Sequence, residues 1–357
     1  MTEQLLLQQI QEIQPLDQES MNQASAHLDQ LTKPQGSLGK LESLAIQLAG
    51  ITGTQAPLLE RRSVIVMAAD HGIASEGVSA YPAEVTPQML LNMLHGGAAV
   101  NVLARQASAH VVCVDIGVNA DIEHPRLHSR SIRKGTANMA EGPAMSRDEA
   151  VRAIRTGMEI AADEVRRGTS LFVTGELGIG NTTASAALIS ALTGLPPARV
   201  VGRGTGLDDA GVHRKTEAIR RSLERNRCDA TDPVGVLAAV GGLEIGGLAG
   251  VILGAALHQC PVMLDGFISA AAALLAVRLA PACAAYMIAS HQSDEKGHAA
   301  VLEQLGLQPM LQLDMRLGEG TGGVLALHLV DAANRIMREM ATFASAGVAG
   351  ASGEVPQ

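Results

Sequence analysis

Short apolar runs alternate with helical stretches from Ser63 onward, and this alternation constrains the fold more than any other feature of the chain. The runs that we expect to form strands cover residues 64–69, 111–114, 171–174, 262–264 and 286–289. Continuous apolar strands joined by helices are typical of a parallel sheet with both faces covered. The sequence therefore predicts an α/β domain over residues 61–330, built on an open parallel sheet.

Each expected strand is followed by polar residues or glycine. The five segments that follow are Asp70-His71-Gly72, Asp115-Ile116-Gly117, Gly175-Glu176-Leu177-Gly178, Asp265-Gly266 and Ser290-His291. Open α/β sheets bind their ligands at the carboxyl ends of the strands, so we expect a binding site there. His71 and His291 are candidates to enter this site, whereas the other histidines have no spacing that suggests a metal.

Composition limits the core and the partners. Apolar residues make up 47% of the chain, aromatic residues only 1%, and there are 38 glycines. A core of small aliphatic side chains needs close approach of backbones, which glycine permits. The formal net charge of −9, with no basic run interleaved with aromatics, argues against a nucleic-acid partner.

The cysteines and the first residues bear on location. Cys113, Cys228, Cys260 and Cys283 are far apart and form no CxxC pair, so we predict reduced thiols. Residues 1–14 lack the basic start and apolar stretch of a signal peptide, which predicts a cytoplasmic protein.

Residues 5–48 have helical periodicity with a turn at 33–39, so we expect residues 1–60 to be a helical segment. We expect the tail after Gly347 to be frayed.

Residues 234–257 are long and apolar enough to be considered as a membrane span. Glu244 near the middle, the glycine pairs and the lack of flanking basic or aromatic anchors argue against stable insertion. Gly242, Gly246, Gly250 and Gly254 recur every fourth residue, which allows tight packing against another helix. We expect this helix in the core.

Residues 175–183, Gly-Glu-Leu-Gly-Ile-Gly-Asn-Thr-Thr, connect a strand to an Ala-rich helix that we expect to begin near Ala184. Backbone amides at such a helix start suit a phosphate. The segment matches neither a P-loop nor a dinucleotide fingerprint. A tight turn with a capped helix explains it equally well, so both interpretations stay open at this stage.

A second glycine-rich loop, residues 202–206, precedes Asp208-Asp209, and Lys215 follows at the start of a helix as a candidate counter-charge for a phosphate. A flexible loop with an aspartate cap and a solvated basic face is the simpler alternative. A metal-bound diphosphate favours an acidic pair directly after an apolar strand, and these aspartates follow a glycine loop instead. We therefore predict no metal.

Glu319 lies between glycines in a third loop, beside the apolar Leu317 and before another helix. Partial desolvation there would raise the pKa of its carboxyl group towards the range of a general base. The positive end of the following helix opposes that effect. Taken alone, a carboxylate that merely favours the helix terminus is the commoner situation.

These loops together resemble the nicotinate-nucleotide:dimethylbenzimidazole phosphoribosyltransferase family. The matching segments cover residues 33–39, 69–72 with 76–78, 142–146, 175–183, 264–267, 290–291 with 295–297, and 315–320. They run in order over roughly residues 30–325, so no single generic motif carries the match.

The resemblance implies an open, Rossmann-like parallel sheet of about six strands with helices on both faces. It also implies a small helical domain from both chain ends, completed by residues 331–357, a homodimer and no cofactor. By position, Glu319 resembles the general base. The residues implied around the phosphoribosyl group are Glu176, Gly178, Gly204, Thr205, Lys215, Asp265, Ser290 and Ser293. Those implied around the acceptor base are Tyr81, Gln88, Met89 and Leu317.

The implied reaction moves ribose 5-phosphate from nicotinate mononucleotide to 5,6-dimethylbenzimidazole or a related base, with inversion at the anomeric carbon. It gives α-ribazole 5′-phosphate and nicotinate, and belongs to cobalamin nucleotide-loop synthesis. From the sheet and glycine loops alone, a dinucleotide-dependent oxidoreductase and a nucleotide-sensing protein remain alternatives.

Overall fold

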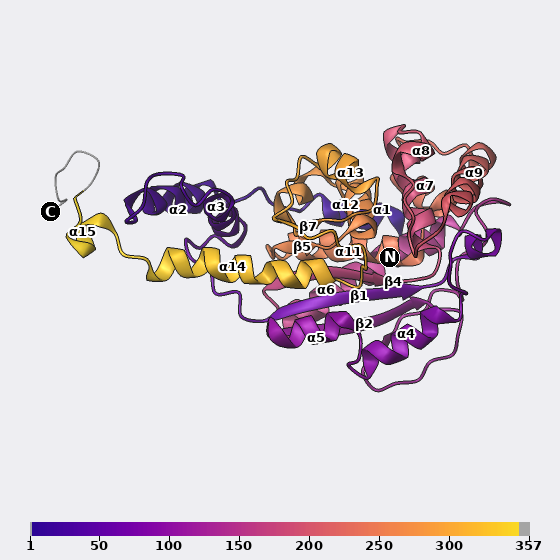
Figure 1. Cartoon of the computed structure of the whole chain (residues 1–357), viewed down its shortest axis with the longest axis horizontal. Helices are drawn as coiled ribbons and strands as arrows, with labels where there is room; N and C mark the ends of the chain where they lie inside the picture. Colours follow the sequence, from indigo (N-terminus) through magenta and orange to yellow (C-terminus); the bar gives the residue numbers. More distant parts are fainter. Residues whose placement is uncertain (1, 350–357) are drawn as a thin grey trace.

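A six-stranded parallel sheet forms the centre of the computed structural model, which describes residues 2–349 (Figure 1). Its strands are β1 (Arg62–Ala69), β2 (Ala109–Gly117), β3 (Leu127–Ser129), β4 (Leu171–Leu177), β5 (Val262–Leu264) and β6 (Met287–Ala289). They are arranged in the order β3-β2-β1-β4-β5-β6. The predicted α/β class and open parallel sheet are confirmed.

Helices surround the sheet. Those of eight residues or more are α1 (Glu3–Ile10), α2 (Gln18–Gln30), α3 (Lys40–Thr52), α4 (Val85–Leu94), α5 (Ala99–Gln106), α6 (Arg147–Arg166), α7 (Asn181–Thr193), α9 (Asp209–Asn226), α10 (Pro233–Val240), α11 (Leu243–Leu257), α12 (Phe267–Leu279), α13 (His298–Leu305) and α14 (Thr321–Glu339). The shorter elements are η1 (Gly72–Glu76), α8 (Pro197–Val200), η2 (Pro281–Tyr286), β7 (His291–Gln292), β8 (Leu311–Gln312) and α15 (Phe343–Ala346).

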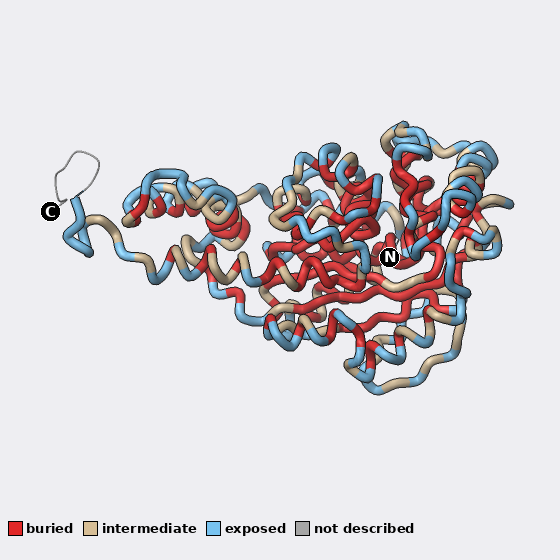
Figure 2. Tube along the Cα trace, viewed as in Figure 1, coloured by how far each residue is buried: buried red, intermediate tan, exposed pale blue. Residues whose placement is uncertain are grey.

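The two faces of the sheet carry separate hydrophobic cores. Along β1, Ile65 and Met67 belong to a core shared with α6, α7, α10, α11 and α12. Val64 and Val66 point to the other face, into a core shared with α3, α4, α5 and α14. Side chains alternate between faces along a strand, so an apolar run without alternation needs cover on both sides. The burial pattern in Figure 2 follows this layering.

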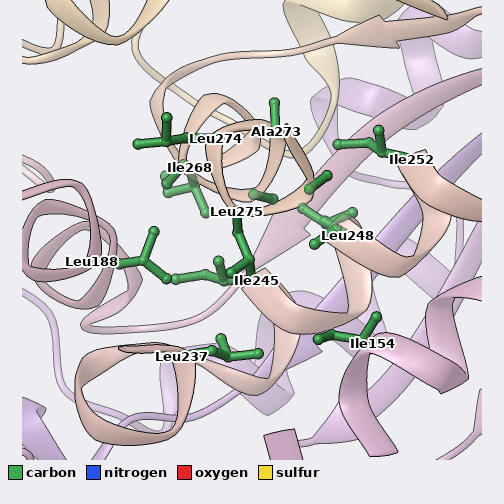
Figure 3. Close-up of a cluster of buried hydrophobic side chains, with 14 of the residues drawn as sticks. Ile154, Leu188, Leu237, Ile245, Leu248, Ile252, Ile268, Ala273, Leu274 and Leu275 are labelled. Atoms are coloured by element: carbon green, nitrogen blue, oxygen red, sulfur yellow. The ribbon is translucent and has the colours of Figure 1, made fainter. Parts of the chain in front are cut away.

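The apolar segment at residues 234–257 forms α10 and α11 in the first core, where side chains of α6, α7, α10, α11 and α12 converge (Figure 3). A methyl group at Gly250 would overlap the carbonyl oxygen of Ile154, and one at Gly157 would overlap that of Gly247. The glycine stripe thus lets α11 and α6 pack backbone to backbone. Within residues 2–349, no helix is both long and apolar enough to cross a bilayer.

Several predicted boundaries need correction. β2 and β4 continue to Gly117 and Leu177, so Asp115 and Glu176 lie within strands rather than after them. β3 lies outside the strands predicted from apolar runs because its three residues, Leu-His-Ser, contain no such run. Tyr286, predicted as the start of a strand, ends η2 instead, since Pro281 favours a helical turn there. The helix predicted near Ala184 begins at Asn181, directly after the left-handed Gly180.

The chain ends contribute two kinds of helix. α2 and α3 lie beside the C-terminal half of α14, away from the sheet (Figure 1), and an isolated bridge joins Leu31 to Thr342. α1 instead packs on α6, where Glu3 pairs with Arg147. The division into domains at residues 60 and 330 stays a prediction. The expected frayed tail lies largely in residues 350–357, outside the described residues.

The strand order fixes where a ligand fits. The connections from β1 lead outward to β2 and β3, whereas the chain from β4 leads in the other direction to β5 and β6. The loops after β1 and β4 therefore diverge and leave a crevice at their carboxyl ends, where open α/β sheets bind ligands. Asp70 and His71 follow one strand of this pair, and Gly178 follows the other.

Candidate active site

Glu319 occupies a strained loop that lies directly on β4. Its φ is 64°, and the flanking Gly318 and Gly320 have φ values of 88° and 92°, so three consecutive residues are left-handed. This region costs a glutamate free energy, and such strain is concentrated at functional sites. A methyl group at Gly175 would lie 2.5 Å from the Glu319 carbonyl oxygen, and one at Gly318 would overlap the Glu176 carboxyl group. The loop therefore places Glu319 beside the phosphate-loop candidate.

The Glu319 carboxyl group is desolvated, which is one of the two situations that its sequence position left open. The residue is 5% exposed, and Oε2 has no hydrogen-bond partner among the described residues. Burial and, less strongly, the charge of Asp265 raise the pKa of this carboxyl group, while the backbone amide of Val100 in α5 lowers it. The sequence analysis expected the positive N-terminus of the following helix to lower this pKa. The amides at the N-terminus of α14 are bonded to Asp265 instead.

Asp265 organises this loop. Oδ2 accepts a hydrogen bond from the Gly320 amide at 3.0 Å, and Oδ1 accepts from Gly322 and Gly323 at 2.8 and 3.1 Å. These are the amides that a helix start leaves without partners. Asp265, 2% exposed, therefore holds the Glu319 loop in place from the end of β5.

Glu176 is the second buried carboxyl group of the site. It is 5% exposed and accepts a hydrogen bond from Asn181 at the start of α7. Burial first, then the charges of Asp265, Glu244 and Glu319, raise the pKa of Glu176 to about 8. The side chain is therefore mainly protonated at pH 7. A methyl group at Gly178 would overlap the Ala69 carbonyl oxygen, so only glycine lets the turn after β4 reach the end of β1.

Lys215 meets this turn from α9. Its side chain is buried, and Nζ donates to Thr182 Oγ1 at 2.8 Å in the first turn of α7. Burial lowers the pKa of Lys215 to about 8, and the charge of Glu295 opposes this. A methyl group at Gly204 would lie 3.2 Å from Nζ, so the second glycine loop also borders the amine.

The second glycine loop connects to both sides of the site. Arg316 donates a hydrogen bond to the Gly204 carbonyl oxygen at 3.1 Å, which ties this loop to the Glu319 segment. Thr205 Oγ1 accepts from the Ala80 amide at 3.0 Å, which ties it to the segment of Tyr81. The Gly204 loop, which borders Lys215, is thus hydrogen-bonded both to the segment before Glu319 and to the segment of Tyr81.

The residues predicted for the acceptor base lie on two loop segments and on α4, and their contact with a base stays a prediction. Tyr81 and Leu317 are 56% and 58% exposed, and both follow segments bonded to the Gly204 loop. Gln88 and Met89 lie on α4, which reaches the site through the hydrogen bond from the Ile179 amide to Thr86 Oγ1 at 3.1 Å. For these two residues the connection is through the helix rather than through their own side chains.

Ser290 and Ser293 lie on the far side of Asp265. Ser290 is fully buried, and its hydroxyl group contacts the Asp265 carbonyl oxygen at 3.4 Å and His291 Nδ1 at 3.1 Å. Ser293 Oγ accepts from the Glu295 amide at 3.3 Å. Both hydroxyl groups therefore already have protein partners, and their contact with a ligand stays a prediction.

Several contacts of the site could not be predicted from the sequence, although their residues lie in or near the segments that the sequence analysis selected. Asn181, Thr182 and Arg316 have ordinary roles in loops and helix starts, and only the fold brings them to Glu176, Lys215 and Gly204. His71 and Glu244, 173 positions apart, form a buried pair behind the Gly178 turn. The sequence feature that pointed to this pair was the position of His71 directly after a predicted strand.

Comparisons with known proteins agree with this geometry. A family model described as phosphoribosyltransferase matches residues 13–348. The nicotinate-nucleotide–dimethylbenzimidazole phosphoribosyltransferase of Chloroflexus aggregans is 58% identical over 96% of this chain and 98% of its own length. Its namesake from Halalkalibacterium halodurans is 54% identical, covering 96% of each chain.

Solved structures give the same result. The crystal structure of nicotinate-nucleotide–dimethylbenzimidazole phosphoribosyltransferase from Thermus thermophilus matches with a TM-score of 0.89 and 48% identity. The match covers 94% of this chain and all of that one. The chain therefore belongs to the nicotinate-nucleotide–dimethylbenzimidazole phosphoribosyltransferase family.

Proposed function

We propose that this protein transfers the ribose 5-phosphate of nicotinate mononucleotide to 5,6-dimethylbenzimidazole or a related base in cobalamin synthesis. The products are α-ribazole 5′-phosphate and nicotinate. The observation that carries the assignment is the strained Glu319 loop, which lies on β4 against Gly175 and Glu176, in a chain of this family. A base and a phosphate site thus share one edge of the sheet.

The reaction needs the two substrates to be held in position and one group to accept a proton. An azole nitrogen attacks the anomeric carbon from the face opposite nicotinate, and the new C–N bond forms as the old one breaks. The electron pair of the broken bond returns to the nicotinate ring nitrogen and neutralises its positive charge. Because the donor already carries this charge, no metal is needed to prepare the leaving group. Inversion converts the β-nucleotide into an α-nucleotide.

Glu319 accepts the proton of the acceptor ring. As the attacking azole gains positive charge, its second nitrogen releases a proton, and a carboxylate with a raised pKa takes it up more readily. A positioned general base contributes roughly 10²- to 10⁴-fold in rate. Tyr81, Gln88, Met89 and Leu317 form the rim against which the aromatic base lies.

Lys215 and the start of α7 hold the phosphate. Within residues 2–349, no side chain caps the N-terminus of α7, whose first residue follows the left-handed Gly180. Helix amides at such an end favour an anion, and the buried ammonium group of Lys215 lies 2.8 Å from Thr182 in the same turn. Glu176, Gly178, Gly204, Thr205, Asp265, Ser290 and Ser293 complete the proposed phosphoribosyl site.

Three expectations extend the proposal. We expect the protein to work as a homodimer in the cytoplasm without a metal or cofactor. Light scattering on the purified protein tests the dimer, and turnover in the presence of a chelator tests the metal.

Nicotinate release is the decisive assay for the function. The protein is incubated with nicotinate mononucleotide and dimethylbenzimidazole, and free nicotinate and α-ribazole 5′-phosphate are quantified. Equal amounts of both products are expected. A nucleotide sensor would bind the mononucleotide and release nothing, and a dinucleotide-dependent oxidoreductase would instead enhance NADH fluorescence on binding.

A further inference from the structure

A short glycine loop, residues 202–207, borders the proposed phosphate site. A methyl group at Gly204 would lie 3.0 Å from Thr182 Oγ1 and 3.2 Å from Lys215 Nζ. These two side chains are hydrogen-bonded to each other at the start of α7. A phosphate held by Lys215 would therefore lie close to the backbone of Gly204.

The loop is closed by its own hydrogen bonds. The amides of Gly206 and Leu207 donate to the Arg203 carbonyl oxygen at 3.1 and 3.0 Å, and Arg203 Nη1 donates to the Leu207 carbonyl oxygen at 2.8 Å. Gly204 and Gly206 are left-handed, with φ values of 52° and 107°, a conformation that glycine adopts without strain. Thr205 lies between these two glycines, so a shift of Gly204 also moves the Thr205 side chain.

The Thr205 hydroxyl group holds the segment that carries Tyr81. Oγ1 accepts a hydrogen bond from the Ala80 amide at 3.0 Å and lies 3.2 Å from Ser79 Oγ, which accepts from the Tyr81 amide at 3.1 Å. Within the part of the chain that the structure describes, no other hydrogen bond reaches these three residues. Ala80 and Tyr81 are exposed, and a backbone with so few bonds opens easily. The position of this segment therefore depends on one hydroxyl group.

The same loop also contacts the segment of Leu317. Arg316 Nη1 donates to the Gly204 carbonyl oxygen at 3.1 Å. Leu317 follows Arg316 directly, just as Tyr81 follows Ala80. Both side chains are proposed to contact the acceptor base, and each is therefore adjacent in sequence to a residue bonded to the 202–207 loop.

We infer that the 202–207 loop couples the two substrate sites, with Thr205 as its positioning residue. A nucleotide that orders the loop at Gly204 also fixes, through the Thr205 hydroxyl group, the segment on which the acceptor base binds. The base then meets a pocket that is already ordered, so its affinity is higher. Thr205, which the resemblance places at the phosphoribosyl group, thus acts on the acceptor base as well. The identity of both ligands rests on the proposed function, whereas the bond between Thr205 and the Tyr81 segment does not.

Hydrogen exchange of the protein without ligand tests this bond. Thr205→Val keeps the shape of the side chain and removes its hydroxyl group. In this variant we expect the amides of Ala80 and Tyr81 to exchange about five- to tenfold faster than in the native protein, because the segment loses its tether. Thr205→Ser keeps the hydroxyl group and should exchange at the native rate. Unchanged exchange in Thr205→Val, or equally fast exchange in both variants, overturns the inference.

Calorimetry tests the coupling. The Kd of 5,6-dimethylbenzimidazole is measured alone and with saturating ribose 5-phosphate, which has no base to release. In the native protein we expect the base to bind about tenfold more tightly when ribose 5-phosphate is present. In Thr205→Val the two Kd values should agree within about twofold, and Thr205→Ser should restore the difference. Equal values in the native protein, or full tightening in Thr205→Val, contradict the inference.

A direct bond from the Thr205 hydroxyl group to the phosphate would give a different result. Thr205→Val would then weaken the binding of ribose 5-phosphate in the absence of any base, and the tightening for the base would persist. This pair of results would assign the hydroxyl group to phosphate binding alone and would overturn the coupling.

Thr193→Val is the matched control. The Thr193 hydroxyl group also has two partners, the Ile189 carbonyl oxygen at 2.7 Å and the Leu195 amide at 3.2 Å, but it lies at the opposite end of α7. Its substitution should change neither the exchange of the Ala80 amide nor the tightening by ribose 5-phosphate. If it abolishes the tightening, the effect is a general loss of stability and the inference fails.

The proposed function and this inference fail separately. If the native protein releases no nicotinate, the proposed function is wrong, but hydrogen exchange still decides whether Thr205 holds the Tyr81 segment. If nicotinate is released and ribose 5-phosphate does not tighten the binding of the base, the proposed function stands and the coupling is rejected.

Discussion

The two ends of the central strands differ in how their buried carboxylates are hydrogen-bonded. At the amino-terminal end, Glu164 accepts hydrogen bonds from Ser63 at 2.8 Å, Thr169 at 3.3 Å and Arg167 at 2.8 Å. At the carboxyl end, oxygen atoms of Asp70, Glu244, Glu295 and Glu319 are buried without partners among the described residues. The buried Glu164 thus has its carboxylate bonded at one end of the sheet, whereas each of these four carboxylates at the other end keeps one oxygen atom without a partner.

The difference separates stability from function. A fully bonded carboxylate contributes to a unique fold, whereas an unpaired one costs free energy that the rest of the structure must offset. The pKa values follow the same division: that of Glu176 is raised to about 8 and that of Lys215 is lowered to about 8. Groups whose charge is disfavoured by burial are available to a ligand that supplies the missing partner.

The sharpest test of this division is Glu319→Gln. We expect kcat to fall by roughly 10²- to 10⁴-fold because the amide cannot accept the proton of the acceptor base. The free energy of unfolding should be unchanged or higher, since the substitution removes a desolvated charge. Product release assays and denaturant unfolding of the same preparation measure both quantities. Near-native turnover would remove the general-base role.

Lys215→Met tests the same comparison at the proposed phosphate site. The substitution keeps the length of the side chain and removes its charge, so we expect the Kd of nicotinate mononucleotide to rise about 10- to 100-fold. Loss of a buried ammonium group should not lower the melting temperature. Calorimetry measures the affinity, and unchanged binding would show that the phosphate lies elsewhere.

Glu164→Gln should have the reverse profile at the amino-terminal end. The free energy of unfolding is expected to fall by about 1–3 kcal/mol because hydrogen bonds to Ser63, Thr169 or Arg167 are lost. The kcat/KM value should stay native. If activity falls while stability is retained, the proposed division between the two ends is wrong.

The smallest expected effect is the change with pH in affinity for nicotinate mononucleotide. Lys215 loses its positive charge and Glu176 becomes negative as pH rises through about 8, so both changes disfavour an anion in the same direction. Affinity for nicotinate mononucleotide should therefore be constant from about pH 6.5 to 7.5 and fall by about tenfold by pH 9. In Lys215→Met only the Glu176 part of this fall should remain. Affinity that rises above pH 8 would contradict both assignments.

Much of the fold follows from periodicity. The long strands β1, β2 and β4 each contain a short apolar run, which is consistent with a strand buried on both faces. β3 could not be found in this way, because an edge strand of three residues that is only half-buried needs no apolar run. The parallel order of the strands likewise depends on tertiary packing rather than on any local signal.

The site was predictable only in part. The glycine loops and strand-end residues marked where a ligand could bind, and the family resemblance supplied roles for Glu319 and Lys215. Spacing alone could not show that Asp265 holds the amides of α14, or that Glu244 lies behind the Gly178 turn. These contacts join residues far apart in the sequence, so no local pattern encodes them.

A crystal structure with α-ribazole 5′-phosphate would test the central claim most directly. The phosphate is expected within hydrogen-bond distance of Lys215 Nζ and the start of α7, with the benzimidazole ring nitrogen facing the Glu319 carboxyl group. Product bound at the opposite end of the strands, in the groove lined by His328, Arg335 and Arg338, would contradict the account.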